Sequence, residues 1–491
     1  MKDLHDLEVL LRSGVPLLVV ETHEETRAVR LLAKAAERLD VHFYTWSVTS
    51  GLCRDGEKIT DDPIAPEPQD ALSRIQDTRY PGLYVLTDFH PYLRDPVHVR
   101  YLREIALRHE RVAHRIALVS HEVDLPPELE RLSRRFELSL PGREAVHMIV
   151  REQATHWSRV NRGQNVRTSR EMLDRLVDSL LGLPEQDVRR LARGAIEDDG
   201  ALDEDDLPEI MKAKFDLLGQ DGVLSFEYDT ARFAQVAGLT RLKRWLELRE
   251  PVFSGRVRRP GLDAPRGVLL LGVQGCGKSL AAKAVAGTWN VPLLRLDFGT
   301  LYNKYHGETE RNLRTSLRQA EVMAPCVLWV DEIEKGISTD DSDSGTSRRI
   351  LGTLLTWMAE RQARVFVVAT ANDIGALPPE LMRKGRFDEI FFVDLPDPET
   401  RRAVLAIHLE RRRIDPTTVD LEAAAQACEG FSGAEIEQAV VAALYASYAA
   451  DQPFDGALLA AEIEATRPLS VVMAERIASL RAWAAERTVP A

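Results

Sequence analysis

One segment of the sequence has the residue types needed to bind the phosphates of a nucleotide. The apolar run Val268–Leu271 leads into a glycine-rich stretch, which is followed by a helical pattern. Glycines let backbone N–H groups turn toward phosphate oxygens, and a helix amino terminus adds a favourable dipole. Lys278 can reach the β- and γ-phosphates, and Ser279 can ligate Mg²⁺. We therefore expect phosphate-binding residues at Gly272, Gln274, Gly275, Cys276, Gly277, Lys278, Ser279 and Leu280.

A second apolar run ends in two adjacent carboxylates, Asp331 and Glu332. We expect Asp331 to hold Mg²⁺ and Glu332 to orient and deprotonate the attacking water, which is the work that phosphoryl transfer requires. Asn372 follows the next apolar run, and neighbouring parallel strands end at one edge of a sheet, so its amide could hold the water or the γ-phosphate. Alone, an acidic pair is often solvated surface and an Asn is often a turn residue. After a phosphate-binding loop, the three together predict Mg²⁺-dependent hydrolysis of a nucleoside triphosphate.

Two arginines, Arg383 and Arg386, lie in the run Arg383-Lys384-Gly385-Arg386-Phe387-Asp388. Guanidinium groups in such a loop could neutralise charge that develops during phosphoryl transfer. From the residues alone, ordinary surface charge is an equal alternative.

The elements that must position these groups follow an α/β pattern. From about Gly261, short apolar runs alternate with amphipathic stretches, which predicts a doubly wound parallel sheet. The expected strands are Val268–Leu271, Val291–Leu296, Val327–Val330, Val365–Ala369 and Ile390–Val393. After about Pro398 the spacing becomes helical, which predicts a small helical lid.

The first 200 residues carry a fainter copy of the same order. The segment Leu125–Leu129 reads Leu-Pro-Pro-Glu-Leu, as does Leu377–Leu381, and a strand over Phe136–Pro141 would match the later one that ends in Leu-Pro. The matched points keep a nearly constant offset, from which we infer an internal duplication. We expect 1–150 as a degenerate α/β domain, 151–205 as a degenerate helical lid, 206–230 as a linker, 231–397 as the active α/β domain, and 398–491 as a helical lid with C-terminal helices.

The first copy lacks the chemical groups of the second. Val20–Thr26 stands at the phosphate-loop position without glycine or lysine, and Asp88-Phe89 stands in place of the acidic pair. The acids in that segment would repel phosphate. The first copy is therefore interpreted as a catalytically dead scaffold or partner surface.

Composition limits the partners. The chain has 491 residues and a formal net charge of −13, which argues against nucleic acid despite the small cluster Arg256, Arg258 and Arg259. The four cysteines are widely spaced, the N-terminus lacks the apolar core of a signal peptide, and no apolar run approaches the ~20 residues of a membrane span. These features predict a cytoplasmic location away from membranes.

Residues 230–450 resemble the AAA family proper, within the AAA+ superfamily, through Lys278, Asp331-Glu332, Asn372 and the Arg383–Asp388 run. The resemblance implies ATP and Mg²⁺ as ligands and makes Asn372 a sensor residue. It implies arginine-finger roles for Arg383 and Arg386, which would act on ATP held by a neighbouring subunit. A homo-oligomeric ring, usually a hexamer, follows from that role. The nucleotide base and ribose would be bordered by Ala237, Gly238, His408, Gly433 and Ala434.

The resemblance also implies a pore loop at Tyr305 and His306, although His306 replaces the usual aliphatic neighbour. Such a loop grips a threaded polypeptide, so the leading hypothesis is a ring that remodels or unfolds a protein client. The alternative is an ATP-state switch or assembly factor that recruits partners without threading them. A zinc protease is disfavoured because no His-Glu-x-x-His motif occurs. The arrangement of a degenerate module before an active one resembles AAA proteins encoded in algal plastid and cyanobacterial genomes.

Overall fold

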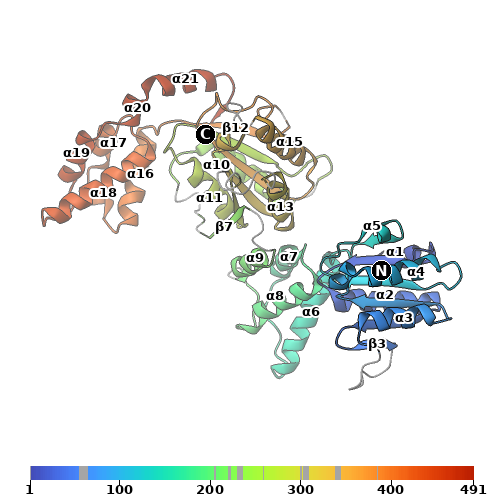
Figure 1. Ribbon diagram of the computed structural model, residues 1–491. Helices are drawn as coiled ribbons and strands as arrows, with labels where there is room; N and C mark the ends of the chain where they lie inside the picture. Colours follow the sequence, from blue (N-terminus) through green and yellow to red (C-terminus); the bar gives the residue numbers. More distant parts are fainter. Residues whose placement is uncertain are drawn as a thin grey trace. The chain divides into compact units, whose positions relative to one another are not determined.

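The computed structural model describes residues 2–54, 65–203, 206–218, 223–228, 230, 236–257, 259–298, 301, 309–337, 344–383 and 385–491. The chain forms two compact units, one from Met1–Glu152 with Leu183–Arg190, the other from Gln153–Gly182 with Leu191–Ala491. Each unit contains one α/β sheet, coloured blue to cyan in the first and green to orange in the second (Figure 1). No helix in the described ranges is long and apolar enough to cross a bilayer.

The first unit is built on a six-stranded sheet of order β3-β2-β4-β5-β1-β6, in which β3 alone runs antiparallel to its neighbour. The strands are β1 Leu17–Glu21, β2 His42–Ser47, β3 Gly51–Arg54, β4 Gly82–Thr87, β5 Arg115–Ser120 and β6 Ser133–Phe136. The helices are α1 Lys2–Arg12, α2 Glu25–Leu39, α3 Pro68–Asp77, α4 Pro96–Leu107 and α5 Pro127–Glu130, with a 3₁₀ turn η1 at His90–Arg94.

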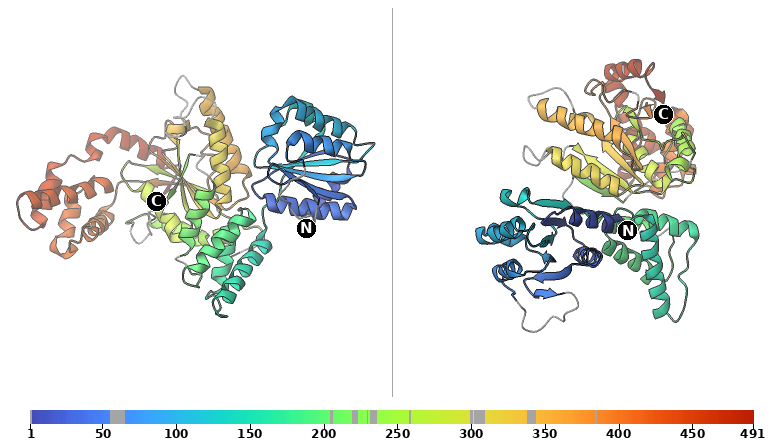
Figure 2. Two further views of the ribbon diagram at one scale, coloured as in Figure 1. Left: turned by 60° about the horizontal axis from the view of Figure 1, so that its bottom comes forward. Right: turned by 90° about the vertical axis from the view of Figure 1, so that its right-hand side faces the viewer.

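Both faces of the first sheet are covered. Side chains alternate along a strand, so Leu17 and Val19 join the core beneath α3 and α4, whereas Leu18 and Val20 pack against α1 and α2. The sheet is seen between these two helical layers in the left view of Figure 2. Burial on both faces explains why β1, β4 and β5 are continuous apolar runs rather than alternating ones.

A helical region follows the first sheet. It comprises α6 Arg143–Val160, α7 Arg170–Leu180, α8 Glu185–Glu197 and α9 Asp206–Leu217. Lys214 of α9 is fully buried and donates hydrogen bonds to the backbone oxygens of Ser179 and Leu181, 2.8 and 2.6 Å away, where α7 ends. The ammonium group thus satisfies carbonyls that a helix carboxyl terminus leaves without partners.

Five strands of the second sheet, β12-β8-β11-β10-β9, repeat the order β6-β1-β5-β4-β2 of the first. The second sheet is seven-stranded, β13-β12-β8-β11-β10-β9-β7, and within it β7 alone is antiparallel to its neighbour. The strands are β7 Leu224–Glu227, β8 Gly267–Gly272, β9 Leu293–Asp297, β10 Cys326–Asp331, β11 Val365–Ala371, β12 Glu389–Val393 and β13 Val489–Pro490. The predicted doubly wound parallel sheet is confirmed.

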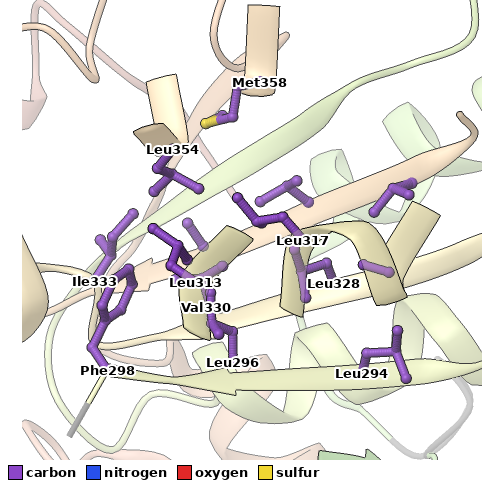
Figure 3. Close-up of a cluster of buried hydrophobic side chains, with 14 of the residues drawn as sticks. Leu294, Leu296, Phe298, Leu313, Leu317, Leu328, Val330, Ile333, Leu354 and Met358 are labelled. Carbon is purple, nitrogen blue, oxygen red and sulfur yellow. The ribbon is translucent and has the colours of Figure 1, made fainter. Parts of the chain in front are cut away.

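Helices cover this sheet on both faces. They are α10 Thr240–Phe253, α11 Lys278–Trp289, α13 Thr309–Val322, α14 Glu334–Ile337 and α15 Ser344–Glu360. Figure 3 shows one face, where side chains of β9 and β10 meet those of α13 and α15. The labelled residues are Leu294, Leu296, Phe298, Leu313, Leu317, Leu328, Val330, Ile333, Leu354 and Met358. This packing fixes the end of β10, from which the acidic pair projects.

The helices after β12 form a lid and a C-terminal extension. They are α16 Pro398–Arg411, α17 Leu421–Ala427, α18 Gly433–Ala449, α19 Gly456–Ala465, α20 Leu469–Val472 and α21 Ala474–Ala484, with a 3₁₀ turn at Pro416–Thr418. α16 through α19 share one core. Leu480 and Ala484 of α21 pack instead on Phe392 of β12, so the last helix belongs to the α/β domain of its own chain.

Two sequence expectations differ from the structure, and two strands were not predicted. Residues 206–230, expected to be a linker, contain helix α9 and edge strand β7. The strand expected over Phe136–Pro141 instead ends at Phe136, because β6 begins at Ser133 and pairs with β1 there. The short strands β2 and β3 carry polar residues among their apolar ones, so no uninterrupted run marks them.

Candidate nucleotide site

The glycine-rich loop joins the carboxyl end of β8 to the amino terminus of α11. A side chain at Gly272 would place its Cβ 2.0 Å from the backbone oxygen of Val393, so only glycine fits between these strands. Gly275 and Gly277 have φ of +78° and +88°, a region that side-chain-bearing residues rarely adopt. The loop can therefore curl as phosphate binding requires, with α11 beginning at Lys278.

Lys278 is folded back into its own loop. Its Nζ donates hydrogen bonds to the backbone oxygens of Gly272 and Val273, 2.9 and 2.7 Å away, and the residue is buried. Burial lowers the pKa of Lys278 to about 8, against the raising effect of nearby Cys276 and of carboxylates led by Glu334. A poorly solvated ammonium group gains from an anionic ligand, so the site suits phosphate.

Asp331 and Ser279 face one another across the sheet edge. The Ser279 hydroxyl lies 3.5 Å from Asp331 Oδ1, which also accepts a 2.8 Å hydrogen bond from Thr370. Hydroxyl and carboxylate oxygens are the donors that Mg²⁺ prefers, so the residues fit that ion. Arg295 of β9 lies 3.2 Å from Asp331 Oδ2, a contact not predicted from the sequence because Arg295 belongs to an apolar strand pattern.

Glu332 has a constrained backbone and two side-chain partners. Its φ is +47°, and its Oε1 accepts a 3.0 Å hydrogen bond from the side-chain amide of Asn372. Lys335, one helical turn away, forms an ion pair with Oε2. Glu332 and Asn372, expected at the same edge of the sheet, therefore contact one another directly.

Glu334 lies behind this pair. One of its carboxylate oxygens accepts a hydrogen bond of 2.9 Å from the backbone N–H of Asn372, while Oε2 is buried and has no partner among the described residues. Burial raises the pKa of Glu334. Glu334 thus places a buried, unpaired oxygen behind Glu332 and Asn372.

The lid reaches the phosphate loop through the start of α18. Ala434 N donates to Gly275 O at 3.0 Å, and a Cβ added at Gly275 would lie 3.0 Å from the Ser432 hydroxyl. Ser432 and Glu435 form a capping box, which fixes the amino terminus of α18. Ala434 and the adjoining Gly433 are therefore beside the loop, as the family resemblance implies.

The other expected base-side residues come from two segments. Gly238, preceded by Ala237, approaches α16, where a Cβ at Gly238 would lie 3.0 Å from the Thr400 side chain. His408, also on α16, lies 3.5 Å from a carboxylate oxygen of Glu437, and burial lowers the pKa of His408. Gln274 and Leu280 are exposed at the loop, whereas Cys276 is part-buried, which raises its thiol pKa to about 12.

The arginine loop lies at the opposite end of β8. Asp388 accepts hydrogen bonds from the backbone N–H groups of Arg266 and Gly267, where β8 begins, and Gly385 O accepts from Arg266 Nη1. Arg386 donates to Leu355 O at 2.6 Å, and Arg383 is exposed. The structure therefore does not bring Arg383 and Arg386 to the phosphate loop of their own chain.

Arg476 of α21 also lies at the site, although the sequence did not predict it. A pocket beside the phosphate loop is lined by Gln274, Asn372 and Arg476, among others, and Arg476 forms a 2.9 Å ion pair with Asp373. In the sequence Arg476 lies well after the Arg383–Asp388 run and within no motif, so nothing local marked it. The expected pore-loop residues Tyr305 and His306, and also Lys384, lie outside the described residues.

Comparisons with known proteins cover nearly the whole chain. A model of the ATPase family associated with various cellular activities (AAA) matches residues 268–395. Models described as the N-terminal domain and the second domain of SpoVK-like AAA ATPases match residues 3–138 and 144–221. The AAA domain-containing protein ycf46 of Pyropia yezoensis is 34% identical over 495 residues, covering 99% of this chain and 98% of that protein. The chain belongs to the AAA ATPase family.

Other relatives of this AAA ATPase agree with that assignment. The ycf46 protein of Guillardia theta is 33% identical over 491 residues, covering 99% of this chain and 95% of that protein. The proteasome-activating nucleotidase of Aeropyrum pernix is 41% identical over 195 residues, 38% of this chain and 47% of that protein. The AAA recognition, including the resemblance to algal plastid proteins, and the assignment of ATPase activity are confirmed.

Proposed function

We propose that this AAA ATPase assembles into a ring, most simply a hexamer, and uses Mg²⁺-dependent ATP hydrolysis to remodel a protein partner. The observation that carries the ring is the position of the arginine loop. Asp388 binds the start of β8, whereas the phosphate loop follows its end. Six residues of strand separate the two by about 16 Å, at roughly 3.3 Å per residue. Arg383 and Arg386 therefore act on a neighbour's ATP.

Within one subunit, each side chain has a defined task. Lys278 exchanges its bonds with Gly272 O and Val273 O for phosphate oxygens. Ser279 and Asp331 hold Mg²⁺, which neutralises phosphate charge when bound. Glu332 accepts a proton from the attacking water, and Asn372 keeps the Glu332 carboxylate oriented through their 3.0 Å hydrogen bond.

Mixing two inactive variants tests the shared site. Glu332→Gln lacks the base and Arg383→Ala lacks the finger, but a ring containing both has complete sites wherever the two adjoin. If subunits exchange at random around a symmetric ring, mixed rings should recover about a quarter of wild-type ATPase activity. Mixing Glu332→Gln with Lys278→Ala is the matched control and should recover none, because each lesion disables its own subunit's site.

The mass of Glu332→Gln with ATP supplies an independent readout. An ATP-dependent shift to about six subunits supports the ring. A monomer in the presence of ATP, together with wild-type protein that hydrolyses ATP as a monomer, overturns it.

The names of relatives suggest that the proposed ring acts on a protein substrate. The FtsH of Acidothermus cellulolyticus is named an ATP-dependent zinc metalloprotease and is 36% identical over 231 residues, 44% of this chain and 34% of that protein. This chain has no His-Glu-x-x-His motif, so cleavage is not proposed.

An unfolding assay tests whether the ring threads a protein. Unfolding of a tagged protein is measured with wild type and with Tyr305→Ala, and Tyr80→Ala, which alters an exposed tyrosine, is the control. Loss of unfolding in Tyr305→Ala alone supports threading, whereas unchanged function favours the ATP-state switch.

The cytoplasmic location expected from the sequence stays a prediction.

A further inference from the structure

The first sheet has polar side chains at the edge where the second sheet carries its acidic pair. The two sheets can be aligned through strand pairs that lie in corresponding cores. Tyr84 and Ile116 pair in the core beneath α3 and α4 of the first sheet, and Leu328 and Val367 pair in the core beneath α13 and α15 of the second. Counting four residues from Tyr84 and from Leu328 reaches Asp88 and Glu332 respectively. The expectation that Asp88-Phe89 matches the acidic pair is therefore shifted by one residue, and Thr87-Asp88 occupies those positions.

Backbone geometry agrees with this correspondence. Asp88 has φ of +50° and Glu332 has φ of +47°, so both residues leave their strands in the same sparsely populated conformation. The same counting places His90 at the position of Glu334, and His121 at that of Asn372. Three positions that contact one another in the second sheet are thus occupied in the first by a carboxylate and two imidazoles.

These three side chains converge. Asp88, His90 and His121 each offer one ligand atom, and the three atoms lie within 4.8 Å of one another. Donors bound to a single tetrahedral zinc ion at about 2.1 Å lie about 3.4 Å apart, so side-chain rotations that move the ligand atoms by roughly an ångström complete a site. The imidazole rings of His90 and His121 meet edge to face, with centroids 4.8 Å apart.

Ser120, the last residue of β5, holds the groups in place. Its buried hydroxyl donates to Asp88 Oδ1 at 3.0 Å and lies 2.8 Å from His90 Nδ1 and 3.4 Å from His121 Nδ1. A serine hydroxyl has one hydrogen, so it can donate to one of these groups at a time. The hydroxyl of Ser120 therefore cannot satisfy all three groups at once, and the cluster keeps ligand atoms that could bind a metal ion.

The charge around the cluster favours a cation. Nearby Glu21 is bound by Arg135 and by the backbone N–H of Val123, and Glu24 is bound by Arg27. The exposed carboxylate of Glu25, the first residue of α2, lies close enough to Asp88 to repel it. A positive ion between their segments relieves that repulsion.

We propose that the first sheet binds one divalent transition-metal ion, with Zn²⁺ as the preferred ion, through Asp88, His90 and His121. Imidazole nitrogens favour transition metals over Mg²⁺, which prefers an all-oxygen shell. Asp88 and His121 are exposed, so one coordination position stays open to water or to a partner's side chain. The module that lost phosphate chemistry thereby has a ligand of its own.

Zinc binding to the full-length protein tests this proposal. Protein stripped with a chelator and dialysed is titrated with Zn²⁺ against a chromophoric competitor, and Co²⁺ absorption in the visible range reports the ligand geometry. Wild type should bind one ion at this site, and His90→Ala and His121→Ala should each weaken it by at least about tenfold. His42→Ala removes an exposed histidine at the start of β2, the far end of the same sheet, and should leave binding unchanged.

Two further measurements separate the outcomes. Zn²⁺ should raise the melting temperature of wild type but not of His121→Ala, and the metal-free melting temperatures show whether that variant folds. Asp331→Asn removes the expected Mg²⁺ ligand on the second sheet and should leave this zinc site intact. Binding that survives both histidine variants, or that disappears in Asp331→Asn, overturns the proposal.

Discussion

The carboxyl edges of the two sheets show how one strand order supports different chemistry. In the second sheet, a glycine-rich turn exposes N–H groups and ends at Lys278, the first residue of α11. In the first, β1 reaches α2 through Thr22, His23 and Glu24, and Glu24 is buried, accepting a 2.6 Å hydrogen bond from the backbone N–H of Glu185. A carboxylate of the chain itself takes up hydrogen-bond donors there. The fold tolerates an acidic segment in place of the phosphate loop because its hydrophobic cores lie on the faces of the sheet, away from that edge.

The comparison also bears on backbone strain. A non-glycine residue in the left-handed region costs about 1 kcal/mol. Asp88 and Glu332 share that conformation, although the sequence around Asp88 lacks the phosphate loop needed for hydrolysis. The strain therefore belongs to the way the chain leaves this strand and is not specific to Glu332, the proposed base.

The largest effect on ATPase activity is expected at the amino terminus of α11, which is compared with the amino terminus of α2 in the first unit. Lys278→Ala removes the ammonium group directed at the phosphates and should lower ATPase activity by about 100-fold or more, measured by phosphate release. Thr26→Ala alters an exposed residue in the first turn of α2, the helix that follows β1 as α11 follows β8, and should leave the rate within about twofold. Comparable losses in both variants would mean that both modules contribute to the nucleotide site.

Residues that lie in motifs could be predicted from the sequence. The phosphate loop, Asp331, Glu332 and Asn372 follow long apolar strands, whose type and order are marked by continuous burial on both faces. The fold class followed from the same runs. Local spacing thus carries information wherever a site is built at strand ends.

Contacts made by residues distant in sequence could not be predicted. Arg476 meets the site because α21 returns to pack on β12, and its neighbourhood in the sequence resembles any exposed helix. The cluster of Asp88, His90 and His121 needs the pairing of β4 with β5 to bring its members together. The expectation of a linker at 206–230 was wrong because β7 is a short edge strand and α9 is buried only through tertiary packing.

Arg476 should give the next largest effect, since its guanidinium lines the pocket beside the phosphate loop. Arg476→Ala should raise the KM for ATP by about tenfold with a smaller change in kcat, because a cation beside Gln274 and Asn372 is lost from the pocket. Arg481→Ala is the matched control on the same helix, where Arg481 pairs with Asp394 outside that pocket lining. Equal effects of both variants would indicate a change in α21 packing rather than a lost contact with nucleotide.

A smaller effect is expected from pH. Lys278 has a pKa of about 8 without ligand, and bound phosphate favours the ammonium form, so binding raises that pKa. The complex then holds a proton that the free protein loses above pH 8. ATP affinity should be constant up to about pH 7.5 and weaken by several-fold by pH 9, as measured by calorimetry with Glu332→Gln. A constant dissociation constant over this range would contradict the lowered pKa.

The smallest expected effect concerns Lys335, whose ammonium forms an ion pair with Glu332, the proposed base. That pairing raises the pKa of Lys335, and the lysine side chain is 67% exposed, so solvent screens most of the interaction. Lys335→Ala should increase kcat by about twofold, because the Glu332 carboxylate then accepts a proton more readily. Added salt should raise the wild-type rate toward that of the variant without changing the variant itself, since screening and deletion weaken the same contact. A rate that falls in Lys335→Ala, and stays low in salt, would instead assign Lys335 a positive role in holding the base.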